Sequence, residues 1–175
     1  MKKRLSLLAV GFLMLLNACQ SNTNTSGSDT SRTTEHDSIA AKFHNHNGLI
    51  NDFEQVFNAA QTDSLQSALE GIKNQGKIVL ALATVDSIAP YRDIVKFATD
   101  LGNRWGLGDS TENNGVLIVF SESLAQVAIV SGVGVQIVYS DTFCESVIQG
   151  SMVPQFVNGH YTQGILDGIA AIGTK

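Results

Sequence analysis

Residues 116–130 read VLIVFSESLAQVAIV, and this stretch decides the fold. Two apolar runs, Val116–Phe120 and Val127–Val130, flank the short polar link Ser121-Glu122-Ser123, a pattern that predicts two strands joined as a hairpin. A third apolar run, KIVLALAT at 77–84, does not alternate between apolar and polar residues. We therefore expect it to form a central strand that is buried on both faces of a sheet.

Amphipathic segments lie between and after these strands and predict helices. We expect the first helix to be capped by Thr62 and to end at Gly76, and the second to open at Pro90 and to end at Gly106. We expect a third helix to start near Asp141 and to end near Val153-Pro154, and a fourth to carry apolar positions from Tyr161 to Ile172. In the last segment, Gly164 and Gly168 predict close packing of the helix on the sheet. Interleaved strands and helices indicate a layered α/β fold.

Composition limits the classes of protein to which the chain can belong. Its 175 residues, 43% of them hydrophobic, suffice for one ordinary domain with a core. The formal charge is -5, with 11 basic against 16 acidic residues, which argues against a nucleic-acid partner. Two cysteines exclude a disulfide-rich scaffold and a four-cysteine zinc site.

The first residues resemble a bacterial lipoprotein signal. Lys2, Lys3 and Arg4 precede the apolar run 5–16, which is too short to span a bilayer. The following Leu16-Asn17-Ala18-Cys19 matches a lipoprotein cleavage site, so we expect residues 1–18 to be removed and Cys19 to carry lipid; a plain secretory signal is the alternative. The mature chain would then have 8 basic and 16 acidic residues, a net charge of -8.

A tether is expected between the lipid and the domain. Residues 20–42 contain ten Ser or Thr and almost no large apolar side chain, a composition typical of disorder. We therefore divide the chain into a signal (1–18), a lipidated Cys19 with a disordered tether (19–42) and a single domain (43–175). This organisation predicts a bacterial cell-envelope protein that is anchored to a membrane on its extracytoplasmic side.

Three features could carry chemistry, and each also has a structural explanation. Cys144 could be a nucleophile, but its apolar neighbours favour a buried core thiol. The segment Gly132-Val133-Gly134 follows a strand as a dinucleotide loop does, but it lacks the third glycine and is better explained by a turn or a close approach of two backbones. His44 and His46 could ligate a metal together, although histidines at the end of a tether are more often solvated.

Oxygen ligands at the ends of predicted elements form a further candidate site. Asp52 precedes the first helix, Asn113 and Asn114 precede a strand, and Asp141 lies where a strand gives way to a helix. Carboxylate and amide oxygens are the ligands that Ca²⁺ and Mg²⁺ prefer. The alternative is that Asp141 caps its helix, Asp52 forms a turn and the two Asn residues shape a loop.

The order of these landmarks resembles that of the TPM-domain family, which includes a thylakoid lumen protein reported as an acid phosphatase. The matching segments span about residues 48–173. They are Gly48-Leu49-Ile50-Asn51-Asp52, Lys77–Val85, Phe97-Ala98, Arg104-Trp105-Gly106-Leu107-Gly108, Asn113–Ile118, Gly132-Val133-Gly134, Asp141, Pro154-Gln155-Phe156 and Gly159–Ile165. The resemblance implies a single α/β sandwich with a mixed central β-sheet flanked by helices.

The resemblance also implies a function and a site. Family members are often secreted or membrane-anchored, and some are described as binding divalent cations. Carried over to this chain, Asp52, Asn114 and Asp141 match the polar site positions, and Gly132 and Gly134 match the turn. The chain departs from the pattern at Leu124-Ala125, where members commonly carry a basic pair, and at Gln136, where they commonly carry Glu.

Two hypotheses follow from the sequence. The first is a lipid-anchored interaction or accessory module that binds Ca²⁺ or Mg²⁺ at Asp52, Asn113, Asn114 and Asp141, with an extracytoplasmic protein as partner. The alternative is a metal-dependent acid phosphatase that hydrolyses phosphomonoesters. The two departures weaken the second hypothesis, because an Arg would clamp a phosphate and a Glu would hold a cation.

Overall fold

A computed structural model of the chain describes residues 42–43 and 46–175. The predicted signal, the lipidated Cys19, nearly all of the tether and His44 lie outside the described residues. Among those that are described, no helix combines the length and apolar character needed to cross a membrane.

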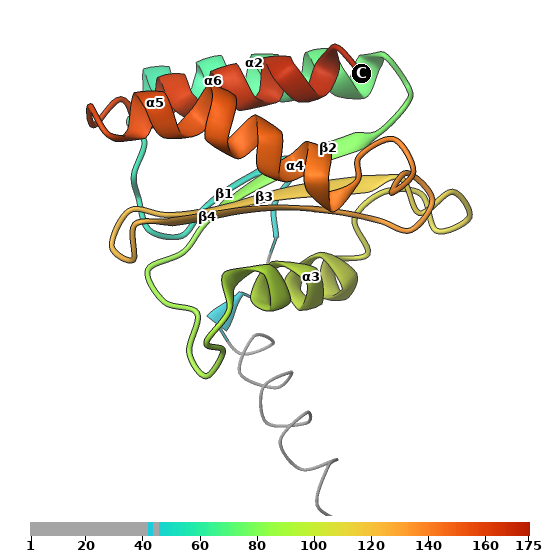
Figure 1. Cartoon of the computed structure of the whole chain (residues 1–175), viewed down its shortest axis with the longest axis horizontal. Helices are drawn as coiled ribbons and strands as arrows, with labels where there is room; N and C mark the ends of the chain where they lie inside the picture. Colours follow the sequence, from blue (N-terminus) through green and yellow to red (C-terminus); the bar gives the residue numbers. More distant parts are fainter. Residues whose placement is uncertain (1–41, 44–45) are drawn as a thin grey trace, which may run out of the picture.

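A mixed four-stranded sheet forms the centre of the domain (Figure 1). Its strands are β1 (Ile50–Asp52), β2 (Val79–Thr84), β3 (Gly115–Ser121) and β4 (Gln126–Ser131), in the spatial order β1-β2-β3-β4. The first three strands run parallel, and β4 returns antiparallel to β3 through the predicted hairpin. The predicted mixed sheet is therefore confirmed.

Helices cover both faces of this sheet (Figure 1). One face carries α2 (Ala59–Asn74), α4 (Asp141–Val147), a π-helical turn η1 (Ile148–Met152), α5 (Val153–Phe156) and α6 (Tyr161–Gly173). The other face carries α3 (Ile94–Trp105). Each face of the sheet has its own hydrophobic core, and β2 contributes side chains to both. Leu80 and Leu82 pack toward the layer of α2, α4, η1, α5 and α6, whereas Ala81 and Ala83 pack toward α3. The unbroken apolar sequence of β2 reflects this burial on both faces, as predicted.

Two helices begin at residues other than those predicted. Helix α2 is capped by Asn58, which forms a capping box with Gln61, so it starts before Thr62. Helix α3 is capped by the Asp93 side chain, and Pro90 lies in the preceding turn instead of opening the helix. Gly106 ends α3 in the left-handed conformation, at the predicted position.

The C-terminal helices differ from the prediction in two ways. The segment that starts at Asp141 does not end at Val153-Pro154, because the π-helical turn η1 leads directly into α5. Gly164 and Gly168 do not face the sheet. A Cβ on Gly164 would lie 2.4 Å from the Phe156 ring, and one on Gly168 would lie 2.9 Å from the Met152 side chain. These two glycines therefore allow α6 to approach η1 and α5.

Candidate functional site

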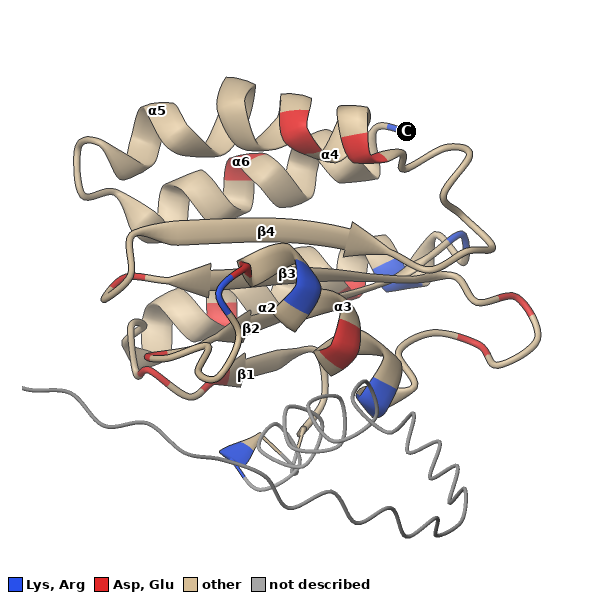
Figure 2. Cartoon of the chain, turned by 60° about the horizontal axis from the view of Figure 1, so that its bottom comes forward, with Lys and Arg blue, Asp and Glu red and all other residues tan. Residues whose placement is uncertain are grey.

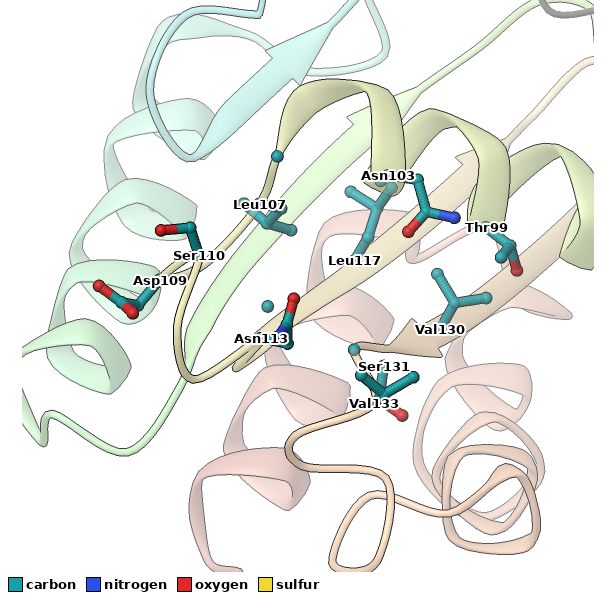
Figure 3. Close-up of a pocket in the computed structure, with 14 residues that line it drawn as sticks. Thr99, Asn103, Leu107, Asp109, Ser110, Asn113, Leu117, Val130, Ser131 and Val133 are labelled. Atoms are coloured by element: carbon teal, nitrogen blue, oxygen red, sulfur yellow. The ribbon is translucent and has the colours of Figure 1, made fainter.

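A cavity of about 290 Å³ lies between α3 and the end of the sheet where β3 begins and β4 ends (Figure 3). Its polar side chains are neutral apart from one carboxylate, that of Asp109. The lining residues are Thr99, Gly102, Asn103, Gly106, Leu107, Asp109, Ser110, Asn113, Gly115, Leu117, Val130, Ser131, Gly132 and Val133. The wall thus combines amides, hydroxyls and glycine backbone with four aliphatic side chains.

The loop that forms one wall is held by its own side chains. The Asp109 carboxylate accepts hydrogen bonds from the backbone N–H groups of Thr111 at 2.7 Å and Glu112 at 3.0 Å. These bonds lower the pKa of the Asp109 carboxyl. Figure 3 shows this carboxylate pointing away from Asn103 and Val133. Asp109 therefore shapes the loop and leaves the interior of the cavity without a charge.

Asn114 completes this loop. Its side-chain oxygen accepts a hydrogen bond from the Asp109 N–H at 2.9 Å, and its side-chain nitrogen donates to the Glu112 carboxylate at 2.9 Å. Asn114 is 7% exposed, so these bonds satisfy a buried amide. Both polar atoms are occupied, and Asn114 acts as a loop scaffold.

Glycines allow the strand ends to meet at the cavity. A Cβ on Gly132 would lie 2.2 Å from the carbonyl oxygen of Asn113, and one on Gly134 would lie 1.7 Å from that of Glu112. No side chain fits at either position. The Gly132 N–H also donates to the Gly115 carbonyl at 2.8 Å, which extends the β3–β4 ladder to the rim of the cavity.

Another predicted ligand, Asp52, lies at the opposite end of the strands from the cavity. It is the last residue of β1, and the register aligns it with Thr84 and, through β2, with Phe120. Phe120 is six residues beyond Asn114, which corresponds to about 20 Å along a strand. The structure therefore does not bring Asp52 together with Asn113 and Asn114.

The Asp52 carboxylate is occupied by contacts within its own loop. It accepts hydrogen bonds from the N–H groups of Val56 and Phe57, both at 3.0 Å, and from the Thr84 hydroxyl at 2.5 Å. These contacts tie the loop after β1 to the end of β2. Asp52 fits the alternative of a turn-forming residue better than it fits a cation ligand.

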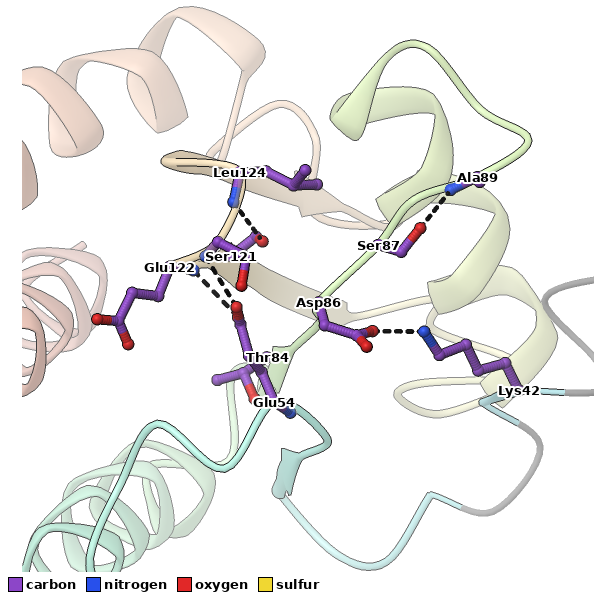
Figure 4. Close-up of polar contacts among 10 residues, drawn as sticks. Lys42, Glu54, Thr84, Asp86, Ser87, Ala89, Ser121, Glu122 and Leu124 are labelled. Carbon is purple, nitrogen blue, oxygen red and sulfur yellow. Dashed lines mark hydrogen bonds and ion pairs between the residues drawn. The ribbon is translucent and has the colours of Figure 1, made fainter.

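The β3–β4 hairpin turn lies at the same end of the strands as Asp52 (Figure 4). The Glu54 carboxylate accepts hydrogen bonds from the N–H groups of Glu122 at 3.0 Å and Ser123 at 2.8 Å. Leu124 and Ala125, which depart from the family pattern, form the rest of this turn and lie far from the cavity. Lys42 and Asp86 form an exposed ion pair nearby.

Asp141 and Asn113, the remaining predicted ligands, do not lie beside Asp52 either. Asp141 is exposed at the start of α4, and the residue that caps this helix is Ser140, not Asp141. Asn113 is exposed, has a positive φ of 48° and lines the cavity. Within the described ranges, no three His, Cys, Asp or Glu residues gather as a metal site. The four predicted ligands thus do not form one cation site.

Cys144 and His46 both pack against neighbours. Cys144 is 4% exposed, and its thiol lies 3.7 Å from the carbonyl oxygen of Tyr139. Burial, with a smaller contribution from the Asp141 charge, raises the pKa of the Cys144 thiol to about 11. A thiol with this pKa is a poor nucleophile at neutral pH, which agrees with the core interpretation. The His46 ring stacks on Trp105 with centroids 5.1 Å apart.

Comparison with known proteins assigns the family. The model of the TPM domain matches residues 50–175, which is most of the chain and all of the sheet. The chain belongs to the TPM-domain family. No curated protein matches this TPM-domain chain.

Solved structures share the fold of this TPM domain. The N-terminal domain of a protein from P. gingivalis is 24% identical, with a TM-score of 0.66 over 79% of this chain and 85% of that one. The BA42 protein from Bizionia argentinensis is 21% identical, with a TM-score of 0.60 over 67% and 79%. The N-terminal domain of the cg2496 protein from Corynebacterium glutamicum is 12% identical, with a TM-score of 0.59 over 74% and 80%. These likenesses show the architecture alone.

Sequence reasoning missed most of the cavity of this TPM domain. Thr99 and Asn103 lie on α3, whose buried apolar face dominated the sequence pattern. No sequence motif marks these two polar residues. Asp109 and Ser110 follow the helix stop at Gly106, and this glycine was the one available signal that a loop begins there.

Proposed function

We propose that this TPM-domain protein is a lipid-anchored binding module on the extracytoplasmic side of a bacterial cell envelope. The observation that carries the proposal is the neutral lining of the cavity between α3 and the β3–β4 strand ends. Amide and hydroxyl side chains recognise uncharged polar groups, and the aliphatic residues beside them accommodate apolar ones.

The ligand that fits this lining is a peptide-like group of a protein partner. Asn103 and Asn113 offer both hydrogen-bond donors and acceptors, and among the described residues neither side-chain amide has a partner. Leu107, Leu117, Val130 and Val133 supply apolar contact area. A phosphate would meet no Lys, Arg or His in the described lining, so binding of an uncharged group is favoured over a phosphorylated substrate.

Divalent-cation binding is a separate part of the proposal. Asp109 and Asn113 line the cavity, and Glu112 lies in the same loop with its carboxylate bonded to Asn114. These three residues are the candidate ligands for Ca²⁺ or Mg²⁺, because the loop hydrogen bonds described above engage Oδ1 of Asp109 and Oε2 of Glu112. Both carboxylate oxygens of Asp52 accept hydrogen bonds, and Asp141 lies on a different element, α4. A titration with Ca²⁺ into the millimolar range, followed by backbone amide shifts, should move this loop. Absence of any shift removes cation binding and leaves the peptide-like ligand untouched.

The experiment that tests the function compares two probes. N-acetylated amino-acid amides should shift the amide resonances of residues that line the cavity, whereas inorganic phosphate, with and without Ca²⁺, should not. Hydrolysis of a chromogenic phosphomonoester that is abolished by a chelator and by Asp109→Asn would instead support the phosphatase alternative and overturn the proposal.

The anchor has its own test. The Leu16-Asn17-Ala18-Cys19 motif supports lipidation of Cys19, and a multiply acylated residue binds a membrane firmly. Membrane fractionation of the producing bacterium should therefore find the parent protein in the membrane and the Cys19→Ala variant in the soluble extracytoplasmic fraction. Membrane retention of the Cys19→Ala variant would contradict lipid anchoring.

A further inference from the structure

Strand β4 is an open edge of the sheet. Within the part of the chain that the structure describes, β4 pairs with β3 alone. At the other edge, β1 spans only three residues, Ile50–Asp52. Short edge strands resist pairing with other chains, whereas longer ones offer unpaired backbone groups to a partner. Of the two edges, β4 with its six residues is the one suited to pairing.

The register identifies which backbone groups of β4 face outward. Gly132 donates its N–H to Gly115, and hydrogen-bonded pairs alternate along an antiparallel ladder. Gln126, Ala128 and Val130 therefore direct their N–H and C=O groups to β3. The N–H and C=O groups of the alternate residues, Val127, Ile129 and Ser131, point away from the sheet.

This edge lacks the usual protection against pairing. Residues 123–140 contain no Lys, Arg, His, Asp or Glu, although the chain holds 11 basic and 16 acidic residues. In Figure 2 the ribbon of β4 and of the segment leading to α4 is accordingly free of charged residues. Sheet edges that must stay unpaired commonly carry charges or proline, and Gln126–Ser131 has neither.

Exposed aliphatic side chains lie beyond both ends of β4. Leu124, in the hairpin turn before the strand, is 38% exposed, and Val133, just after it, is 77% exposed. Ile129 lies between them. Rotation by 180° about an axis through Ile129 exchanges the two ends of the strand, so the edge is complementary to itself.

We propose that β4 pairs antiparallel with β4 of a second copy of this chain across a two-fold axis at Ile129. Ile129 then exchanges N–H···O=C bonds with its counterpart, and Val127 exchanges them with Ser131 of the second copy. The two sheets become one continuous sheet. The turn that carries Leu124 in one copy lies against the segment that carries Val133 in the other, which covers both exposed side chains.

A second copy fits this edge for an electrostatic reason as well. Two copies of an acidic chain repel each other at most surfaces, but the segment 123–140 brings no charge into the contact. Each copy contributes the same groups to the contact, namely the outward backbone groups of β4 and the side chains of Leu124 and Val133.

Paired charge substitutions test this arrangement in the full-length protein in a mild detergent. Light scattering corrected for bound detergent should report a dimer for the parent protein, with dissociation on dilution. The double variant Leu124→Glu/Val133→Glu places like charges against each other and should be monomeric. The double variant Leu124→Lys/Val133→Glu places opposite charges together and should dimerise, which shows that substitution at these positions preserves the fold.

The matched control uses two exposed valines that lie outside the segment 123–140, one on α3 and one just after α5. Val95 and Val157 are 51% and 76% exposed, and Val95→Glu/Val157→Glu should dimerise like the parent. A parent protein that is monomeric at every concentration overturns the proposal. So does a dimer that survives in Leu124→Glu/Val133→Glu, because its interface would then lie elsewhere. A further contradiction would be equal masses for the two charged pairs at 124 and 133.

Discussion

Gly132 packs so closely on Asn113 that a Cβ added to Gly132 would lie 2.2 Å from the carbonyl oxygen of Asn113. The backbone at the end of β4 therefore contacts the backbone of the loop before β3. Gly132 and Asn113 both line the cavity to which we assign ligand binding. Asn113 can line the cavity because no side chain stands between its backbone and β4. The site thus depends on a packing contact and not on an assembly of charged residues.

Gly132→Ala should destabilise the domain. The added methyl group cannot avoid a backbone carbonyl, and overpacking of this kind costs about 1–3 kcal/mol. Urea unfolding measures the loss. Gly150→Ala is the matched control, because a Cβ at Gly150 meets nothing within 4 Å. Equal unfolding midpoints for Gly132→Ala and the parent would contradict the close contact.

Asp52→Ala should destabilise the domain without changing any binding at the cavity. The substitution leaves two backbone N–H groups and the Thr84 hydroxyl without their acceptor, at a cost of about 1–3 kcal/mol. Asp63→Ala, on the exposed side of α2, should change stability by less than about 0.5 kcal/mol. A Ca²⁺ response at Asn113 that is abolished by Asp52→Ala would contradict the separation of Asp52 from the cavity.

Asn114→Ala should loosen the loop that walls the cavity. The Asp109 N–H loses its acceptor, and the buried site loses two hydrogen bonds, at a cost of about 1–3 kcal/mol. Native-state hydrogen exchange should show faster exchange of the Asp109 amide than in the parent, while Asn74→Ala at the end of α2 leaves it unchanged. Unaltered exchange at Asp109 would mean that Asn114 does not hold this loop.

Cys144 should contribute an alkaline loss of stability. Burial raises the pKa of its thiol to about 11 in the folded state, above the ordinary value of 9.0, so the folded protein binds this proton more tightly than the unfolded chain does. The resulting stabilisation is complete below pH 9 and declines as the pH rises from about 9 to about 11. Cys144→Ala should lower stability at pH 7 but flatten this part of the pH profile. A profile of unchanged shape would show that another group titrates there.

Much of the architecture could be predicted because burial leaves a direct mark on sequence. Continuous apolar runs marked β2 and β3, and the Ser121-Glu122-Ser123 link marked the hairpin. The sequence does not single out the helix starts, because several polar residues before α2 and α3 can cap a helix. Tertiary structure selects Asn58 and Asp93 from among them.

The site could not be predicted for a topological reason. Asp52 and Asn114 both lie at strand ends, but Asp52 is the last residue of β1 whereas Asn114 immediately precedes β3. In parallel strands the start of one strand and the end of another lie at opposite ends of the sheet, so strand order and direction must be known before side chains can be grouped. Asn103 left no signal, because a polar residue on the exposed side of an amphipathic helix is expected everywhere.

The affinity of the Asn103→Leu variant for an N-acetylated amino-acid amide tests the central claim most directly. Leucine is close to asparagine in size but removes the hydrogen-bonding amide from the cavity wall, whereas Asn74→Leu makes the same change on α2, away from the cavity. Amide-shift titrations should give a dissociation constant about tenfold higher for Asn103→Leu than for the parent, the equivalent of about 1.4 kcal/mol, and an unchanged one for Asn74→Leu. Equal affinities for all three proteins, or no shift at the lining residues in the parent, would contradict a binding function for this cavity.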